Sequence, residues 1–182
     1  MQSFDALDKP WRLALSLAWE ALAEGSVPVG AVLCDGYGEV VASGRNRIYG
    51  SGADTPPGHV AGSAIAHAEI NTLATVPFGF YADHVLYSTV EPCLLCTAAL
   101  RLTHIGTVVF AAEDPKWSGM DRLDEVNPHF GRHAARRVGP VDGPVRAFSK
   151  LMYEGYSLQH PAPRPELSKL SVEEAFQLAQ SA

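Results

Sequence analysis

Cysteine is scarce in this sequence, and the small number limits the structural roles that the cysteines can have. Among 182 residues only three are cysteine: Cys34, Cys93 and Cys96. An odd and small number excludes a disulfide framework of the kind that staples small secreted domains. Two of the three stand in the stretch STVEPCLLC, residues 88–96, with a proline directly before the first. In a reducing compartment, which we expect to be the cytoplasm, such a pair indicates a metal site or a catalytic thiol.

The sequence also lacks long hydrophobic runs and an excess of basic residues. No apolar stretch approaches the roughly 20 residues that span a bilayer, and the N-terminus shows no leader followed by a cleavage site, so we expect neither membrane contact nor a signal peptide. With 14 Lys and Arg against 20 Asp and Glu, the formal net charge is −6. This balance argues against nucleic acid as the main partner. The basic group formed by Arg132, Arg136 and Arg137 is expected to be a solvated surface.

What remains is the composition of an ordinary globular domain. Hydrophobic residues make up 47% of the chain and charged residues 19%, which is typical of one domain with a sizeable core. Apolar spacing and turn signals predict, in order, helix 10–24, strands 27–34 and 39–46, an irregular loop 49–63, helix 64–76, strand 83–89, helix 93–104, strand 106–112, helix 144–159 and helix 171–180. This order predicts an α/β fold, a three-layer α/β/α sandwich with a central mixed sheet of about five strands.

The two clustered cysteines are placed for metal binding. Cys93 and Cys96 lie one turn apart at the start of a predicted helix, so both sulfurs can face one point. A helix start stabilises thiolates, which are the form of cysteine that binds soft metals. His67 opens another predicted helix, and the first turns of two such helices meet at the carboxyl ends of the strands. These three residues would then be ligands of a tetrahedral Zn²⁺ ion, with the fourth position left for water.

Glu69, two positions after His67, is the predicted catalytic residue. Zinc lowers the pKa of bound water from 15.7 to about 7, and a nearby carboxylate can move the water's proton to a departing group. The alternative for Cys93 and Cys96 is a redox dithiol or half of a structural zinc knuckle. A structural site needs a fourth ligand, and only Cys34 is left among the cysteines. Cys34 lies in an apolar strand, where we expect a core thiol.

HAEI at 67–70 and EPCLLC at 91–96 together form H-x-E followed by P-C-x-x-C, the signature of zinc-dependent nucleobase deaminases. On these motifs the chain resembles the cytidine/deoxycytidylate deaminase superfamily. VPVGAVL, GRNR and HIGTVVFAAED are similar to the branch of guanine deaminases and bacterial tRNA adenosine deaminases. The resemblance runs from about Trp11 to Trp117. It implies a cytidine deaminase-like fold, a zinc cofactor, hydrolysis of a cyclic amidine C–N bond with release of ammonia and, by analogy, a homodimer.

The resemblance also implies roles for single residues. Glu69 matches the proton shuttle, Asn46 matches an asparagine that holds the base, and Ala68 matches the residue whose backbone N–H meets the ring carbonyl. Asp114 falls near acidic residues that read the purine edge, and Trp117 is a candidate wall of the pocket. Each has a plainer alternative. Asn46 and Asp114 could be turn residues, and Trp117 could belong to the core.

Three functions are compatible with these motifs. We expect a deaminase of a small heterocycle, such as guanine or a nucleoside, because the loop 49–63 lacks Lys and Arg and the tail 161–182 is not basic. The alternative is a tRNA adenosine deaminase that produces inosine. A non-catalytic zinc scaffold would need a broken ligand set or shuttle, and neither is broken. We expect the deaminase domain to cover residues 1–160, followed by a linker and a capped helix over 161–182.

Overall fold

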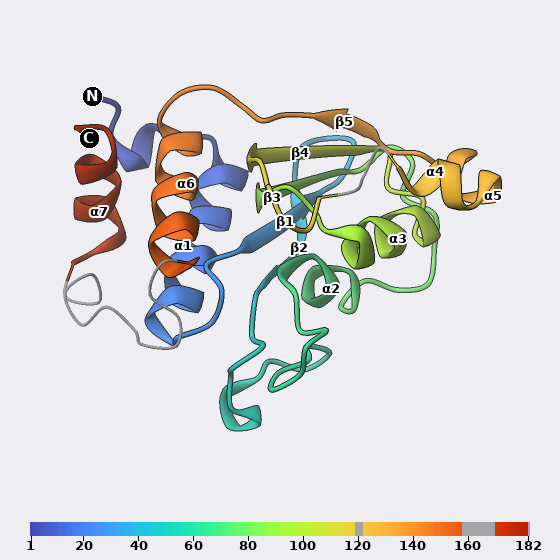
Figure 1. Cartoon of the computed structure of the whole chain (residues 1–182), viewed down its shortest axis with the longest axis horizontal. Helices are drawn as coiled ribbons and strands as arrows, with labels where there is room; N and C mark the ends of the chain where they lie inside the picture. Colours follow the sequence, from blue (N-terminus) through green and yellow to red (C-terminus); the bar gives the residue numbers. More distant parts are fainter. Residues whose placement is uncertain (119–121, 158–169, 182) are drawn as a thin grey trace.

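The computed structural model describes residues 1–118, 122–157 and 170–181 (Figure 1). The expected boundary between residues 160 and 161 and the linker 161–166 lie outside the described residues. Among the described ranges, no helix combines the length and apolar character needed to cross a bilayer.

A five-stranded mixed sheet forms the centre of the molecule. Its strand order is β2-β1-β3-β4-β5, with β1 at Gly30–Cys34, β2 at Val40–Arg45, β3 at Val85–Val90, β4 at Thr107–Ala112 and β5 at Arg136–Val138. Strand β1 pairs antiparallel with β2, to which the DGYG turn joins it, and also with β3. Strands β3, β4 and β5 run parallel. The parallel half needs helical crossovers, whose starts lie at the carboxyl ends of its strands.

Helices cover both faces of this sheet, as the expected three-layer sandwich requires. Helix α1 at Lys9–Ala23, α6 at Pro144–Ser157 and α7 at Val172–Ala179 lie on one face. Helix α2 at Ala68–Leu73 and α3 at Leu94–Leu102 lie on the other. Two short helices, α4 at Leu123–Val126 and α5 at Pro128–Gly131, follow beside α3 (Figure 1). Single turns of 3₁₀ helix occur at Phe4–Ala6 and Gly52–Asp54.

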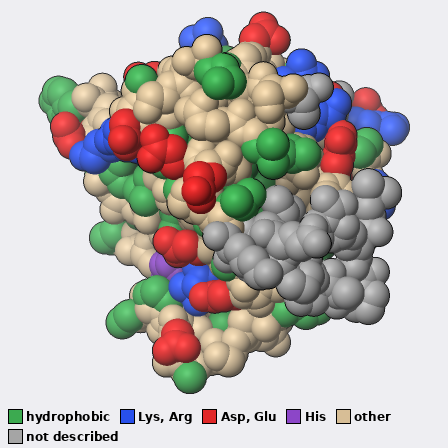
Figure 2. All heavy atoms as spheres, turned by 90° about the vertical axis from the view of Figure 1, so that its left-hand side faces the viewer, with side chains coloured by type: hydrophobic (Ala, Val, Ile, Leu, Met, Phe, Trp, Pro, Cys, Tyr) green, Lys and Arg blue, Asp and Glu red, His purple; other side chains and the backbone are tan. Residues whose placement is uncertain are grey.

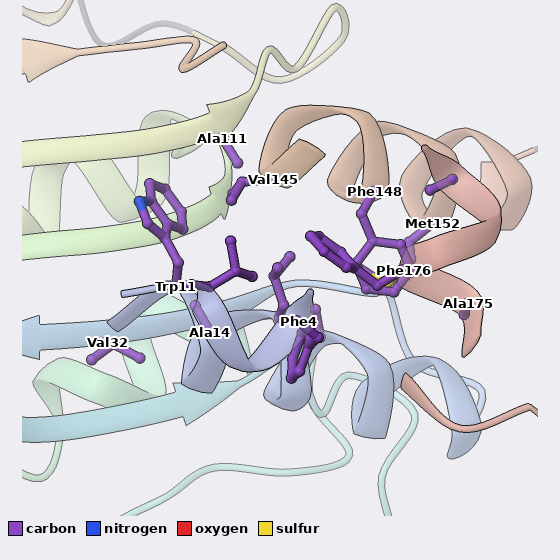
Figure 3. Packing of buried hydrophobic residues seen from close by; sticks show 14 of the residues in the cluster. Phe4, Trp11, Ala14, Val32, Ala111, Val145, Phe148, Met152, Ala175 and Phe176 are labelled. Carbon is purple, nitrogen blue, oxygen red and sulfur yellow. The ribbon is translucent and has the colours of Figure 1, made fainter. Parts of the chain in front are cut away.

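A large apolar cluster, the first core, joins α1, α6 and α7 to the sheet. Its buried members are Phe4, Leu7, Trp11, Ala14, Leu15, Ala18, Val32, Cys34, Ala111, Val145, Phe148, Met152, Ala175, Phe176 and Ala179. Figure 3 shows the rings of Phe4, Phe148 and Phe176 packed together, with the ring of Phe176 edge-on to both neighbours at centroid distances of 5.4 and 5.5 Å. Through these rings α7 packs directly against α6 and the N-terminal segment. The predicted capping box of Ser171 and Glu174 is present at its start.

The second core packs α2 and α3 onto the opposite face. Its buried residues are Leu33, Ala42, Leu73, Leu86, Leu100, Ile105 and Val108. Helix α2 approaches the sheet closely because Gly44 has no side chain: a Cβ there would lie 2.6 Å from the backbone nitrogen of Thr72. This close packing fixes the start of α2 against the sheet.

The segment after Asp114 holds structure that the sequence patterns did not predict. Strand β5 is only three residues long, too short to show alternation, and α4 and α5 are single turns. Arg132 and Arg136 are exposed, as expected. Arg137 is also partly exposed, with 37% of its side chain accessible, but its guanidinium contacts the buried carboxylate of Glu91.

Candidate active site

The predicted ligands meet where parallel strands β3 and β4 end. His67 is the residue immediately before α2, and Cys93 holds the same place before α3. Cys96 lies in the first turn of α3 and is fully buried. The patterns predicted helices from residues 64 and 93, with His67 and Cys93 inside them. The structure starts these helices at Ala68 and Leu94, directly after the two ligands. Since the first N–H groups of a helix have no intrahelical partner, the two starts present positive dipole ends to the same point.

The three side chains converge at distances suited to one metal ion. The Nδ1 atom of His67 lies 3.5 Å from the Sγ atom of Cys93 and 3.4 Å from the Sγ atom of Cys96, and all three ligand atoms lie within 4.8 Å of one another. Tetrahedral zinc with bonds of about 2.3 Å to sulfur and 2.0 Å to nitrogen requires a sulfur–nitrogen separation of about 3.5 Å. The side chains therefore fit zinc, as the sequence predicted.

Contacts among the three predicted ligands shift the pKa values of the two thiols in opposite directions. The contact with the Cys96 side chain, together with the hydrogen bond to His67, lowers the pKa of Cys93 to about 4 despite its burial. The pKa of Cys96 is raised by its contact with Cys93 and by burial. The hydrogen bond to Cys93 also raises the pKa of His67. Cys93 is therefore a thiolate at neutral pH, the state that binds metal. Cys34 lies apart from this group, buried in the first core as predicted.

Glu69 places its carboxyl group beside the ligands. The side chain is buried, its Oε1 atom accepts a hydrogen bond from the Ser88 hydroxyl at 3.2 Å, and its Oε2 atom accepts from Cys96 at 3.3 Å. Burial raises the pKa of Glu69. A raised pKa lets a carboxyl group hold a proton more readily than an exposed one, which suits a general acid and base. Glu69 therefore lies beside the metal ligands, and its role in proton transfer remains a prediction.

A cavity of about 600 Å³ opens beside these residues. Its lining includes the residues Val27, Val29, Asn46, Ile48, Ala64, His67, Glu69, Val90, Glu91, Cys93, Leu94, Leu95, Asp114, Lys116, Trp117, Ser118 and Tyr153. Asn46, Asp114 and Trp117, predicted to bind substrate, are among them. Ala68, the fourth such residue, is buried at the first position of α2. The structure thus gathers the four residues around one site, and their roles there remain predictions.

Asp114 takes part in two structures at once. It lines the cavity, and its Oδ1 atom accepts the backbone N–H groups of Lys116 at 2.9 Å and Trp117 at 3.0 Å. Its carboxylate therefore holds the turn that carries the next residues of the cavity wall. Trp117 is 68% exposed, so the alternative that it belongs to the core is wrong.

Tyr153 is a residue of the cavity that the sequence analysis missed. It comes from α6, on the opposite face of the sheet from the ligand-bearing helices, and hydrogen-bonds to Asp114. Burial, together with the nearby Asp114 carboxylate, raises the pKa of Tyr153 to about 12, so it remains a hydrogen-bond donor at neutral pH. No local signal marks this residue, because only tertiary packing brings α6 to the site.

Comparison with known proteins extends the likeness beyond the short motifs. The model of the cytidine and deoxycytidylate deaminase zinc-binding region matches residues 6–112. The tRNA(Ile)-lysidine synthase of Deinococcus radiodurans is 32% identical over 171 residues, covering 85% of this chain. The chain spans only 28% of that protein's length. The tRNA-specific adenosine deaminase 2 of Danio rerio is 28% identical over 186 residues, covering 94% of this chain and 81% of that protein.

Two solved structures share the fold. One comes from a study of A-to-I editing by tRNA:A34 deaminases. It is 30% identical, with a TM-score of 0.58, and the match covers 71% of this chain and 95% of that one. The other is the guanine deaminase of Nitrosomonas europaea, 18% identical with a TM-score of 0.61, covering 84% and 87% of the two chains. At that identity the second likeness concerns the fold alone.

Proposed function

We propose that this chain, which belongs to the cytidine and deoxycytidylate deaminase family, is a hydrolytic deaminase that converts adenosine in transfer RNA to inosine. The observation that carries the proposal is the 30% identity to the tRNA:A34 deaminase structure, of which 95% is covered. The adenosine deaminase relative from Danio rerio supports the same substrate. These relatives favour the alternative that the sequence analysis placed second to a small heterocycle.

The rim of the cavity supports an RNA substrate. Enzymes that act on a base in nucleic acid must take it out of the stack and hold it in a pocket. Trp117 lies at the cavity with 68% of its surface exposed, and Lys116 beside it is exposed too. Aromatic rings stack on unpaired bases, and lysine neutralises phosphate. Figure 2 shows acidic side chains spread over the face that carries α6 and α7, together with some Lys and Arg side chains.

The site contains the groups that deamination needs. The reaction forms a C–O bond from water at the amino-bearing ring carbon, breaks the C–N bond and releases ammonia. His67, Cys93 and Cys96 would hold zinc, which acidifies water and so supplies a nucleophile at neutral pH. Glu69 would accept a proton at Oε2 and later donate it to the departing nitrogen, while the Ser88 hydroxyl holds Oε1.

Substrate positioning falls to the cavity wall. Asn46 lines the cavity, and its Oδ1 atom accepts the backbone N–H of Ile48 at 3.1 Å, which leaves the amide hydrogens as the donors it can offer to a ring nitrogen or carbonyl. Ala68 begins α2, so its N–H belongs to the first turn, where donors lack helical acceptors. These two residues would orient the ring between Glu69 and the metal ligands.

Free guanine or a nucleoside is the second candidate. The net charge of −6 and the absence of Lys and Arg from the loop 49–63 favour it, because neither feature attracts a phosphate backbone. Either candidate uses the same ligands and the same general acid and base. The two candidates differ in whether the rim of the cavity contacts the rest of an RNA chain or only a small molecule.

Paired substrates separate the two candidates. Zinc-loaded protein would be incubated with a transfer RNA carrying adenosine at the wobble position, the same RNA with guanosine there, free adenosine, guanine and cytidine. We expect inosine, detected by mass spectrometry after nuclease digestion, only from the first RNA. Glu69→Gln serves as the inactive control. Ammonia released from guanine or a free nucleoside, with no inosine in RNA, would overturn the proposal in favour of the second candidate.

We also propose that the protein pairs as a homodimer. Leu94, Leu95 and Leu102 are all substantially exposed along α3, the first two also lining the cavity, and exposed apolar side chains on one helix support association between copies. Light scattering coupled to size-exclusion chromatography would test this. A mass of one chain at micromolar concentration would contradict it.

A further inference from the structure

Glu91 is a buried carboxylate that the proposed chemistry does not use. It follows β3 directly and precedes Cys93 by two residues, and its side chain is only 4% exposed. Its Oε1 atom accepts a hydrogen bond from the Arg137 guanidinium at 2.5 Å, and its Oε2 atom accepts the backbone N–H of Asp114 at 3.3 Å. A buried carboxylate is tolerated only with such partners. Both oxygens are therefore committed to holding other segments.

Arg137 reaches Glu91 from β5, the strand at the edge of the sheet. Its guanidinium carbon also lies 5.0 Å from the ring centroid of Phe110, which is fully buried in β4. Guanidinium groups bind carboxylates directionally and stack on aromatic rings at the same time. The neighbouring Arg136 is exposed and points to the other face of the sheet, since side chains alternate along a strand.

The contacts of Glu91 continue in a closed circuit. Asp114, held by Glu91, accepts the N–H groups of Lys116 and Trp117. Ser118, the next residue, pairs with Cys93 as an isolated β-bridge. These contacts connect Glu91 to the cavity wall at residues 114–118, and the wall in turn contacts the metal ligand Cys93.

From this circuit we infer that Arg137 and Glu91 are positioning residues for the deamination. Together they set the cavity wall at residues 114–118 relative to the Cys93 turn. The inference deepens the proposed function and rests on deaminase activity, not on the choice of RNA as substrate. Neither side chain needs to touch the substrate. Both act through the backbone of Asp114 and the turn that it holds.

Substitutions at two neighbouring arginines test the inference. Arg137→Ala should lower kcat/KM about 10- to 100-fold, because small misplacements of a substrate-binding wall cost that much. Arg136→Ala should stay within about twofold. Arg137→Lys keeps the positive charge but lacks the planar guanidinium group, so its kcat/KM should lie between those of Arg137→Ala and Arg136→Ala. Zinc content, measured by elemental analysis, should not change. Wild-type kinetics in Arg137→Ala, or a loss explained entirely by lost zinc or unfolding, would overturn the inference.

A second variant tests the carboxylate itself. Glu91→Gln keeps the shape but replaces two acceptors by one acceptor and one donor, so one contact is lost. We expect a similar decrease in kcat/KM and little further loss when Arg137→Ala is added, since the two residues act as one unit. Fully additive losses would contradict a shared role.

A spectroscopic measurement separates the inference from the proposed function. The chain has three tryptophans, so a ¹H–¹⁵N spectrum shows three indole signals, and Trp117→Phe identifies that of Trp117. The Trp117 signal should shift in Arg137→Ala and Glu91→Gln and not in Arg136→Ala. Wild-type protein that deaminates a free base but leaves adenosine in transfer RNA unchanged would overturn the proposed substrate alone. An unmoved Trp117 signal would overturn the positioning role alone.

Discussion

The two faces of the sheet differ in what they bury. The face under α1, α6 and α7 buries the first core, which includes the phenylalanine rings of α6 and α7. The face under α2 and α3 buries titratable groups at one end: Glu69, Glu91 and Cys96, with His67 and Cys93 partly covered. Apolar burial stabilises a fold, whereas buried charge costs free energy unless it is paired. Both faces bury apolar residues, but only the face under α2 and α3 also buries the groups of the proposed chemistry, at some cost to stability.

This difference predicts that replacing a cysteine on the α2/α3 face abolishes zinc binding and activity, whereas replacing one in the first core affects only stability. Cys93→Ala removes a metal ligand, so we expect loss of bound zinc, activity below detection and a lower melting temperature, since metal binding and folding are coupled. Cys34→Ala is the matched control, because Cys34 is a buried thiol of the first core. It should keep zinc and activity and lose only modest stability. Elemental analysis with thermal unfolding checks both variants. Metal retained by Cys93→Ala would mean that the ligand assignment is wrong.

A second substitution on the same face should separate chemistry from folding. Glu69→Gln preserves shape and the contact with Ser88 but removes the group that moves protons. We expect kcat to decrease about 10²- to 10⁴-fold, the usual contribution of general acid–base catalysis. Zinc content and the melting temperature should stay near the wild-type values, because a buried carboxyl group is replaced by a neutral one. Unchanged turnover would exclude the proton-transfer role.

The same division explains what the sequence could predict. His67, Glu69, Cys93 and Cys96 were predictable because their spacing within two helix starts is a local pattern, and both starts lie where strands end. The mixed sheet followed from the order of helices and strands. Tyr153 and the pairing of Arg137 with Glu91 were not predictable, because α6 and the short β5 reach the site only through tertiary packing. Asp114 was ambiguous for a physical reason: its carboxylate holds a turn while it lines the cavity.

The apolar face should respond to substitution through stability alone. Phe176→Ala removes a fully buried ring that contacts Phe4 and Phe148. We expect the free energy of unfolding to fall by about 3–5 kcal/mol, the usual loss for phenylalanine in a packed core. Phe78→Ala is the control, because the Phe78 side chain is 98% exposed, and it should cost almost nothing. Denaturant unfolding measures the difference. Activity per folded molecule should stay constant at low temperature, and a specific loss of kcat would show that the two faces are coupled.

The smallest expected effect concerns the start of α7. The Ser171 hydroxyl accepts the backbone N–H of Glu174 at 3.2 Å, and the Glu174 carboxylate accepts the backbone N–H of Ser171 at 2.7 Å. Ser171→Ala removes one of these caps and should cost about 1 kcal/mol of unfolding free energy, because α7 carries Phe176 into the first core. Ser51→Ala is the control, since Ser51 precedes the turn at Gly52–Asp54 without a side-chain cap. Equal stability of the two variants would mean that α7 frays independently of the core. The first core would then end at α6, and the contrast between the two faces would rest on α1 and α6 alone.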